Sequence, residues 1–418
     1  METDQLFSSA QKKFCINFVV SNGGGGHIAT YHALRAIIEQ KQLPWKIDIF
    51  NVDTFIECLA QQTNLIDIYR LFGTTGDEVI NKAQKQNWKF IQKLTMHLNK
   101  FLVKLNYSLG VRMTVEEWYK RQPDLIVSVV PLYNQVIWES LQKVKPETPV
   151  VTIMTDFADC PPGFWIEPKT GNYLICGTEK AVEQADYLGV SKERIIKTSG
   201  MVIHPKFYQP ILDEQTQALC STDRRSQRQN LGLDPDCLTG VVLFGGCGSK
   251  QMLDIAKWLE YFQHKLQLIF LCGRNEEVAL MLRQQTSIQK KIVVTFTQNI
   301  PYYMYLSDFF IGKPGPASIS EALAMKLPVI VECNSGTLPQ EKYNADWIRQ
   351  QQVGLVIPSF RQIQKAVEQF LNPEIFADYC KNVAEINNRA VFEIPEILQQ
   401  ILEQHYPSTP AVKKVQKF

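Results

Sequence analysis

Short runs of apolar residues, each followed by a turn or a glycine-rich loop, recur along this chain. Residues 14–20 read FCINFVV and residues 149–154 read PVVTIM. Such runs predict parallel strands covered on both faces, because both sets of side chains are then buried. The same pattern predicts further strands at residues 45–52, 123–129, 173–176, 195–200, 241–244, 268–273, 292–296, 309–311, 328–331 and 354–357.

Glycine-rich loops follow two of the predicted strands. The first strand runs into SNGGGGH at residues 21–27, and a helix is predicted from residue 28 to residue 40. The strand at 241–244 runs into GGCGS at residues 245–249. A strand, a glycine loop and a helix form the first unit of a doubly wound sheet, so the sequence predicts an α/β fold. The loop at residues 21–27 has neither the sequence of a Walker A loop nor the spacing of a dinucleotide fingerprint.

The segment from Ile311 to Asn344 contains the most informative pattern. An apolar strand ends in a Gly/Pro loop and a helix follows directly. The free N–H groups at a helix start bind anions, and Ser318 could add a hydroxyl donor. Glu321 lies one turn into the helix, where a carboxylate could accept two hydrogen bonds from a ribose diol. The alternative is a plain strand, turn and helix with a solvated glutamate.

Two carboxylates follow the predicted strand at 149–154. Asp156 comes just past the end of that strand, where parallel sheets place chemically active side chains. Asp159 lies further along the loop, and we expect it on the surface.

Composition narrows the range of functions. The chain has 418 residues, 45% of them hydrophobic, which suffices for two domains, and its net charge of +2 gives no general case for nucleic-acid binding. The ten cysteines show neither a CxxC pair nor zinc spacing, so reduced thiols in the cytosol are expected. No apolar run is long enough to span a membrane, and the first 13 residues lack the apolar segment of a signal peptide. Contact with lipid would therefore be peripheral.

A basic segment at residues 79–112 differs from the rest. It holds seven Lys or Arg residues, no Asp or Glu, and several aromatic side chains. Cationic helices with an apolar face suit anionic membrane surfaces. The residues expected to touch the membrane are Trp88, Lys89, Lys93, Phe101 and Lys104. An ordinary helix pair on the sheet and an RNA-binding surface are the alternatives.

The segment from Ile311 to Asn344 resembles the donor-sugar signature of GT-B glycosyltransferases, in the family 28 group that contains diacylglycerol galactosyl- and glucosyltransferases. That signature reads K-x-G-P-x-x-I-x-E-A-L, then G-L-P-I-I, then G-Q-E-x-x-N. The matching residues are Lys313, Gly315, Pro316, Ile319, Glu321, Ala322, Leu323, Leu327, Pro328, Gln340, Glu341 and Asn344.

Other segments resemble the same group. The loop at residues 21–27 is similar to its S-x-x-G-G-G-H loop, and residues 268–275 are similar to its I-C-G-R-N run. Asp156 and Trp165 match its T-D loop. One or two histidines usual in that loop are replaced here by Pro161 and Glu167, which puts the acceptor side in question.

The resemblance implies a GT-B fold, with two Rossmann-like domains facing a central cleft. We expect an N-terminal acceptor and membrane-side domain at 1–205 and an interdomain connection at 206–238. A nucleotide-sugar domain follows at 239–365. Helices at 366–418 return to the first domain and end in a loose tail.

The resemblance also implies inverting transfer of a hexose from a UDP-sugar to a lipid, most simply 1,2-diacylglycerol. His27 would be the general base, with Asp156 orienting it or replacing it. The donor residues would be Gly245, Gly246, Gly248, Arg274, Gly315, Pro316, Ala317, Ser318, Glu321, Gln340, Glu341 and Asn344. The acceptor side would include Gly24, Gly25, Gly26 and Trp165. Neither an obligatory cofactor nor a metal is expected, and the enzyme would lie on the cytoplasmic face of an anionic membrane.

Three alternatives stay open at this point. The acceptor could be another lipid or a polyprenyl-linked sugar. A UDP-sugar 2-epimerase shares this fold. A non-catalytic protein that binds UDP-sugar would also fit the missing histidines. The sugar itself, galactose, glucose or N-acetylglucosamine, is not defined by any one side chain.

Overall fold

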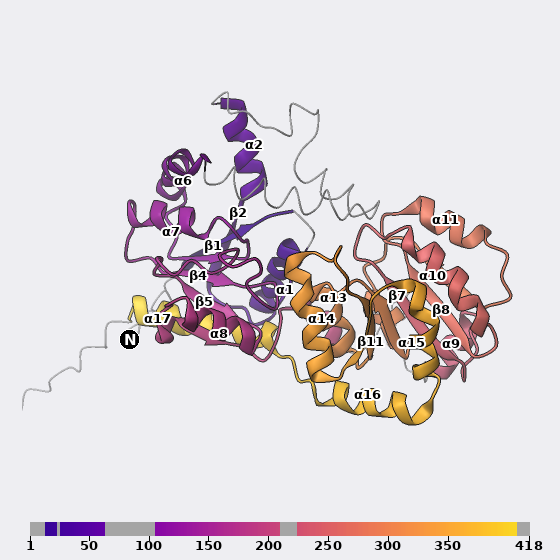
Figure 1. Cartoon of the computed structure of the whole chain (residues 1–418). Helices are drawn as coiled ribbons and strands as arrows, with labels where there is room; N and C mark the ends of the chain where they lie inside the picture. Colours follow the sequence, from indigo (N-terminus) through magenta and orange to yellow (C-terminus); the bar gives the residue numbers. More distant parts are fainter. Residues whose placement is uncertain (1–12, 23–25, 63–104, 210–223, 408–418) are drawn as a thin grey trace, which may run out of the picture.

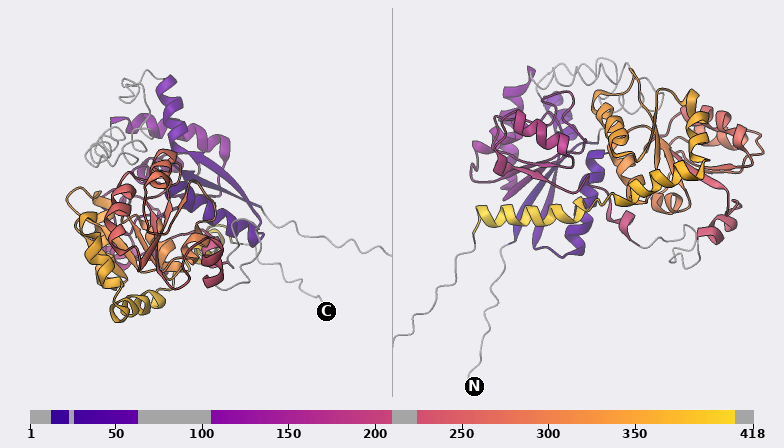
Figure 2. Two further views of the ribbon diagram at one scale, coloured as in Figure 1. Left: turned by 90° about the vertical axis from the view of Figure 1, so that its right-hand side faces the viewer. Right: turned by 60° about the horizontal axis from the view of Figure 1, so that its bottom comes forward.

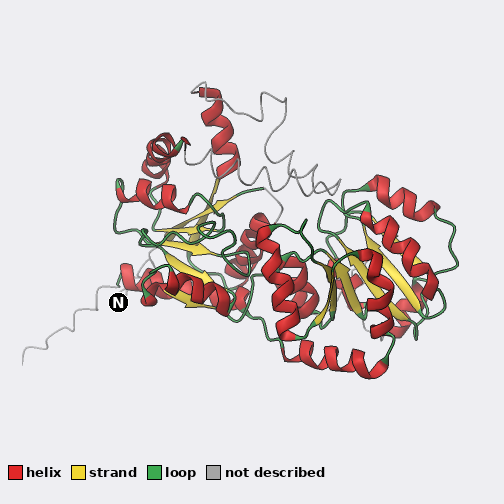
Figure 3. Ribbon diagram, in the orientation of Figure 1, coloured by secondary structure: helices red, strands yellow, loops and turns green. Residues whose placement is uncertain are grey.

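Two parallel sheets form the centre of the molecule, as the apolar runs predict (Figure 1). The computed structural model describes residues 13–22, 26–62, 105–209 and 224–407. The first sheet has six strands in the order β2-β1-β3-β4-β5-β6, and the second has six in the order β12-β11-β10-β7-β8-β9. Helices cover both sheets (Figure 3). The GT-B fold class is thereby supported by an α/β architecture with two doubly wound halves.

The strands of the first sheet are β1 (Phe14–Val20), β2 (Trp45–Asn51), β3 (Leu125–Ser128), β4 (Val150–Ile153), β5 (Tyr173–Cys176) and β6 (Ile195–Lys197). Its helices are α1 (Gly26–Gln40), α2 (Val52–Gln62), α6 (Tyr107–Arg121), α7 (Asn134–Gln142) and α8 (Glu179–Tyr187), with the 3-10 turns η1 (Lys192–Arg194) and η2 (Pro205–Tyr208). Tyr31, Leu34 and Ile37 of α1 pack on one face of this sheet. Trp118 of α6 and Leu141 of α7 pack on the other.

The strands of the second sheet are β7 (Leu238–Leu243), β8 (Leu266–Leu271), β9 (Lys291–Val294), β10 (Phe309–Gly312), β11 (Val329–Glu332) and β12 (Gly354–Ile357). The helices around it are α9 (Arg224–Asn230), α10 (Gln251–Leu259), α11 (Glu276–Gln284), α12 (Ile300–Tyr305), α13 (Pro316–Ala324), α14 (Pro339–Gln351), α15 (Ile363–Phe370) and α16 (Pro373–Glu385), with the turns η3 (Glu260–Phe262) and η4 (Phe360–Gln362). Separate apolar clusters fill its two faces.

Both sheets change winding direction beside a glycine loop. β1 pairs with β2 on one side and β3 on the other, and β7 likewise lies between β8 and β10. Ligands of open α/β sheets bind beyond the carboxyl ends of strands at such a reversal. The loops after β1 and β7 are therefore the places where the fold itself favours a binding site.

β2 ends earlier than the sequence pattern predicts. The strand stops at Asn51 and α2 begins at Val52. The Asn51 side-chain oxygen accepts hydrogen bonds from the N–H groups of Asp53 and Thr54, at 3.0 and 3.3 Å. Such capping satisfies donors at a helix start, which explains why the helix begins at the last residue of the predicted strand.

The last helix, α17 (Ala390–His405), returns to the first sheet (Figure 2). Its buried residues Val391, Ile394 and Leu398 belong to the apolar cluster that also contains α1. The chain just before α17 lies beside η2, where the Tyr208 hydroxyl donates to the Asn388 carbonyl at 2.7 Å. The two passages of the chain between the sheets therefore touch each other.

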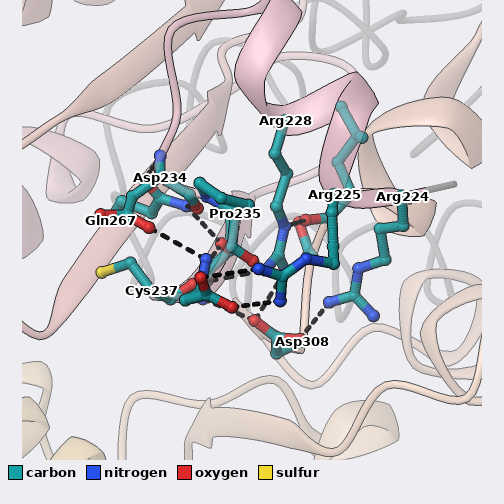
Figure 4. Close-up of polar contacts among 12 residues, drawn as sticks. Arg224, Arg225, Arg228, Asp234, Pro235, Cys237, Gln267 and Asp308 are labelled. Atoms are coloured by element: carbon teal, nitrogen blue, oxygen red, sulfur yellow. Dashed lines mark hydrogen bonds and ion pairs between the residues drawn. The ribbon is translucent and has the colours of Figure 1, made fainter.

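An arginine cluster connects α9 to the base of the second sheet (Figure 4). The Arg228 guanidinium, buried, donates to the Asp308 carboxylate at 2.7 Å and to the Leu306 carbonyl at 2.8 Å. Arg224 pairs with the same carboxylate. Asp308 also accepts the Thr239 N–H at 2.7 Å, so one carboxylate joins α9, β7 and the turn before β10.

The basic segment lies largely outside the described residues. The expected membrane contacts Trp88, Lys89, Lys93, Phe101 and Lys104 all fall in the undescribed range 63–104. Across the part of the chain that is described, no helix combines the length and apolarity needed to cross a membrane.

Candidate active site

His27 and Asp156 come from different elements of the first sheet. His27 is the second residue of α1 and follows the glycine loop after β1. Its Nδ1 lies 3.2 Å from the Thr155 hydroxyl, and its ring lies 5.8 Å from that of Trp165. Burial lowers the pKa of His27 to about 4, although a hydrogen bond with the Val129 backbone opposes this. The imidazole is therefore neutral at pH 7.

Asp156 is buried just beyond the end of β4 and has a raised pKa. Its side chain is 8% exposed, and the Trp165 indole N–H donates to Oδ2 at 2.8 Å. Burial raises the pKa of Asp156 to about 7; the indole hydrogen bond opposes the shift, and the negative charge of Glu341 adds to it. Lys313 lowers it again. Since Glu341 and Lys313 belong to the second sheet's domain, charges from both domains meet at this carboxyl group.

Asp159 differs from its expected place on the surface. It is 1% exposed, and its carboxylate accepts the N–H groups of Gly163, Phe164 and Trp165 at 2.7, 2.9 and 2.6 Å. Burial raises the pKa of Asp159, while these hydrogen bonds oppose the rise. Three hydrogen bonds compensate the cost of burying the carboxylate. The expectation was wrong, because the loop folds back around Asp159 and thereby fixes Trp165 beside Asp156.

The loop before α13 carries a partly buried ion pair. Lys313 Nζ lies 3.1 Å from Glu341 Oε1, and the side chain of Glu341 is 10% exposed. Asn344 Nδ2 donates to the Pro314 carbonyl at 2.8 Å, so a side chain of α14 holds the loop in place. The N-cap of α13 is Gly315, which has no side chain to cap the first N–H groups. Pro316, Ala317 and Ser318 follow as half-buried residues of the first turn.

Two amide oxygens near this loop have no hydrogen-bond partner within the described chain. They are the buried Oε1 of Gln340 and Oδ1 of Asn344. Buried polar atoms in native proteins are almost always paired, so these two oxygens are candidates to accept hydrogen bonds from a bound molecule. Both residues come from the sequence motif at 339–344.

The glycine loop after β7 is held in a form that only glycine adopts freely. Gly245 and Gly248 have φ of 74° and 59°, and a Cβ on Gly248 would lie 2.4 Å from the Cys272 carbonyl oxygen. In contrast, a Cβ on Gly246 would meet no protein atom within 4 Å. The loop is thus packed on one side and open on the other. Arg274 is exposed, with its guanidinium 5.2 Å from the centre of the Phe296 ring.

Glu321 lies on α13 near the junction of the two domains. It is half-buried, and burial raises its pKa to about 7, whereas the charge of Lys206 acts in the opposite direction. Lys206 belongs to η2, which follows the first sheet. This carboxyl group is therefore influenced by the segment that joins the two domains.

The structure brings part of the expected set together. His27, Asp156 and Trp165 are neighbours, and Asp156 feels the charges of Lys313 and Glu341. An aromatic contact, Phe157 with Trp347 at 5.1 Å between ring centres, joins the same two regions. Gly26 begins α1, while Gly24 and Gly25 lie outside the described residues.

Sequence reasoning missed three side chains at this site. Lys313 was part of the motif but was given no role, although a cation between two carboxyl groups is a clear electrostatic feature. Thr155 precedes Asp156 and could have been found as its neighbour. Lys206 carries no motif signal. Among the described residues, no three His, Cys, Asp or Glu side chains gather as a metal site.

Two family models match the chain over separate regions. The model described as monogalactosyldiacylglycerol (MGDG) synthase matches residues 32–203. The model described as the glycosyltransferase family 28 C-terminal domain matches residues 241–401. The first match begins after β1 and the glycine loop, and the second begins within β7.

Curated relatives are plant MGDG synthases. Monogalactosyldiacylglycerol synthase 2 of Arabidopsis thaliana is 26% identical over 306 residues, which cover 68% of this chain and 60% of that protein. Monogalactosyldiacylglycerol synthase 1 of the same plant is 24% identical over 404 residues, covering 92% of this chain and 70% of that protein. The chain thus spans about 60% of the length of the first of these relatives.

Solved structures share the fold at low identity. MurG of Acinetobacter baumannii superposes with a TM-score of 0.55 at 12% identity, covering 93% of this chain and all of MurG. The S. aureus MnaA–UDP structure gives a TM-score of 0.59 at 12% identity, covering 94% of this chain and 97% of MnaA. At this identity the likeness concerns the fold alone.

Proposed function

Because this chain belongs to the MGDG synthase-like group of glycosyltransferase family 28, we propose that it transfers a hexose from a UDP-sugar to a lipid hydroxyl, with 1,2-diacylglycerol as the acceptor. The product would be a monoglycosyldiacylglycerol with inverted configuration at the anomeric carbon. One observation carries this proposal most directly. Asp156 of the first domain lies where the charges of Lys313 and Glu341 of the second domain reach it.

The chemistry is a direct displacement. The lipid hydroxyl oxygen attacks C1 of the sugar, and the bond from C1 to the diphosphate oxygen breaks, so that UDP leaves with the bonding electrons. The hydroxyl proton passes to a general base. Asp156 suits this role better than His27, because a base works best with a pKa near the working pH, and these are about 7 and about 4. His27, neutral, would orient the hydroxyl.

The second domain would hold the donor. The open side of the glycine loop at Gly246 and the uncapped start of α13 offer N–H groups to the two phosphates. Lys313 would stabilise the charge that develops on the departing diphosphate. Glu321 would accept hydrogen bonds from the ribose, and the amide groups of Gln340 and Asn344 would bind the sugar. Arg274 would lie at the nucleobase end.

The same proposal includes a membrane surface. The basic segment at 79–112 would attach the enzyme to anionic lipid on the cytoplasmic side of a membrane, close to its lipid substrate. No nucleic acid takes part. A vesicle flotation assay with and without anionic lipid tests this, and equal binding to both vesicle types would contradict it.

The decisive test is a UDP-release assay on the purified chain. It crosses UDP-galactose, UDP-glucose and UDP-N-acetylglucosamine with vesicles that do or do not contain diacylglycerol. We expect one of these donors to release UDP, and only when diacylglycerol is present. The Asp156→Asn variant serves as the inactive control. Conversion of a donor without any acceptor would instead indicate an epimerase. Donor binding by calorimetry without release would indicate a binding protein.

A further inference from the structure

Lys206 lies at the junction of the two domains, next to Phe207, which packs in the apolar cluster of the second sheet. It lies in η2, directly after the segment that leaves β6. Its ammonium group donates to the carbonyl of Gln298, in the loop between β9 and α12, at 2.6 Å. This hydrogen bond holds the end of a flexible side chain and so fixes the Lys206 ammonium group in position.

Electrostatics connect this lysine to Glu321. Burial lowers the pKa of Lys206, and the negative charge of Glu321 partly restores it. In the other direction, Lys206 is the charged side chain in the described chain that lowers the otherwise raised pKa of Glu321. Phe207 of η2 and Leu323 of α13 belong to one apolar cluster, so η2 packs on the helix that carries Glu321. Lys206 and Glu321 therefore lie close enough for their charges to act on each other.

The remaining titratable groups near Lys206 do not compete for this role. His204 lies on the same segment, and its Nδ1 accepts a hydrogen bond from the backbone N–H of Lys206 at 3.2 Å. Burial, and then the charges of Lys206 and of His32 on α1, lower the pKa of His204. The histidine is therefore neutral near pH 7, and Lys206 remains the positive group that faces Glu321.

We propose that Lys206 is a positioning residue for the donor, which keeps the Glu321 carboxylate charged and ready to accept hydrogen bonds from the ribose hydroxyls. This rests on the proposed function, in which Glu321 binds the ribose. A carboxylate accepts two such bonds, whereas a protonated acid must use one oxygen as a donor.

UDP binding measured by calorimetry between pH 6 and pH 9 tests this inference. Glu321 has a pKa of about 7, so UDP affinity in the wild type should rise as the pH passes through 7. Loss of the Lys206 charge moves that pKa upward. If it moves by about one unit, Lys206→Met binds UDP about fivefold more weakly at pH 7 and equally well at pH 9, because the ionised fraction falls from about half to about a tenth. Lys206→Arg keeps the charge and should behave as the wild type.

A matched control comes from Lys326, two residues after the C-terminal end of α13. Its ammonium group also donates to backbone carbonyls, those of Ala384 and Ile386 at 3.3 and 2.8 Å, and burial also lowers its pKa. Lys326→Met therefore removes a similar lysine without a charge that acts on Glu321. Its UDP affinity should follow the wild-type pH curve.

Each outcome has a defined meaning. A Lys206→Met curve with the wild-type midpoint, or one weakened equally at every pH, would overturn the inference. Glu321→Gln separates this from the parent proposal. If Glu321→Gln binds UDP as the wild type does, the ribose role of Glu321 itself fails. If Glu321→Gln is weak and insensitive to pH while Lys206→Met keeps its midpoint, only the role of Lys206 fails.

Discussion

At the scale of single residues, burial gives the two candidate bases different base strengths. His27 and Asp156 are both buried in the same region, but burial favours the neutral form of each. The neutral form of histidine is itself the base, and a lower pKa makes it a weaker base. The neutral form of aspartic acid is the protonated acid, and a higher pKa makes its carboxylate a stronger base. The same environment thus makes Asp156 the better proton acceptor of the two.

Replacing Asp156 by Asn should lower kcat by about 10²- to 10⁴-fold, the usual contribution of a general base. Donor binding should change little, because the amide keeps the shape of the side chain. Steady-state UDP release and calorimetric UDP binding measure the two effects. A variant with kcat within threefold of the wild type would assign the proton to another group, with His27→Ala as the next variant to test.

The rate should depend on pH in a defined direction. Asp156 acts when ionised, and its pKa is about 7, so kcat/KM should rise with pH through 7 and level off above it. Trp165→Phe removes the indole N–H that stabilises the carboxylate. The pKa of Asp156 then rises further, and the rising part of the kcat/KM profile should move to higher pH. A profile that stays in place in Trp165→Phe would show that another group controls it.

At the scale of elements, the glycine loop after β7 separates folding from binding. Gly246→Ala places a methyl group on the open side of the loop, where no protein atom lies within 4 Å. The melting temperature should therefore match the wild type, while UDP affinity falls if phosphates occupy that side. Unchanged UDP affinity would move the phosphate site elsewhere.

Gly248→Ala is the complementary change in the same loop. Its Cβ would lie 2.4 Å from the Cys272 carbonyl, at a φ of 59°. A non-glycine residue in this conformation costs about 1–2 kcal/mol before any clash is counted. We expect a lower melting temperature, measured by thermal unfolding followed by circular dichroism. A variant as stable as the wild type would mean that the loop can adopt another conformation.

Asp308 holds the start of the second domain together, through Arg228, Arg224 and the Thr239 N–H. Asp308→Ala leaves the buried Arg228 guanidinium without its carboxylate. Breaking a buried pair in this way typically costs about 3–5 kcal/mol, so urea unfolding should shift clearly. Arg225→Ala, at an exposed pair with Asp236, is the matched control and should shift it little.

Local patterns predicted the elements well and their contacts poorly. The apolar runs located β1 and β5 closely, because a buried parallel strand must be apolar throughout. The early end of β2 depends on one capping side chain, Asn51, which a hydrophobic pattern does not contain. The position of Asp159 depends on how a loop closes on itself, so its carboxylate was misplaced.

At the scale of the whole molecule, the site depends on two distant segments. Asp156 and Glu341 are far apart in the sequence, and nothing local announces that their charges meet. The motif around Lys313 pointed to the second domain, and the T-D loop pointed to the first, but only the arrangement of the domains joins them. Lys206 shows the same limit, because a single lysine with no motif becomes informative only beside Gln298 and Glu321.

The contact between Tyr208 and Asn388 has a mechanical consequence. The chain passes from one domain to the other near η2 and returns just before α17, and the Arg389 guanidinium also lies over the Tyr208 ring, at 5.5 Å. Two crossings fastened side by side hold the domains together at one place, so any rotation of one domain against the other would turn about that place. Opening would then swing Asp156 away from Lys313 along an arc while that place stays fixed. Substrate entry and reaction would become two positions of a single rotation.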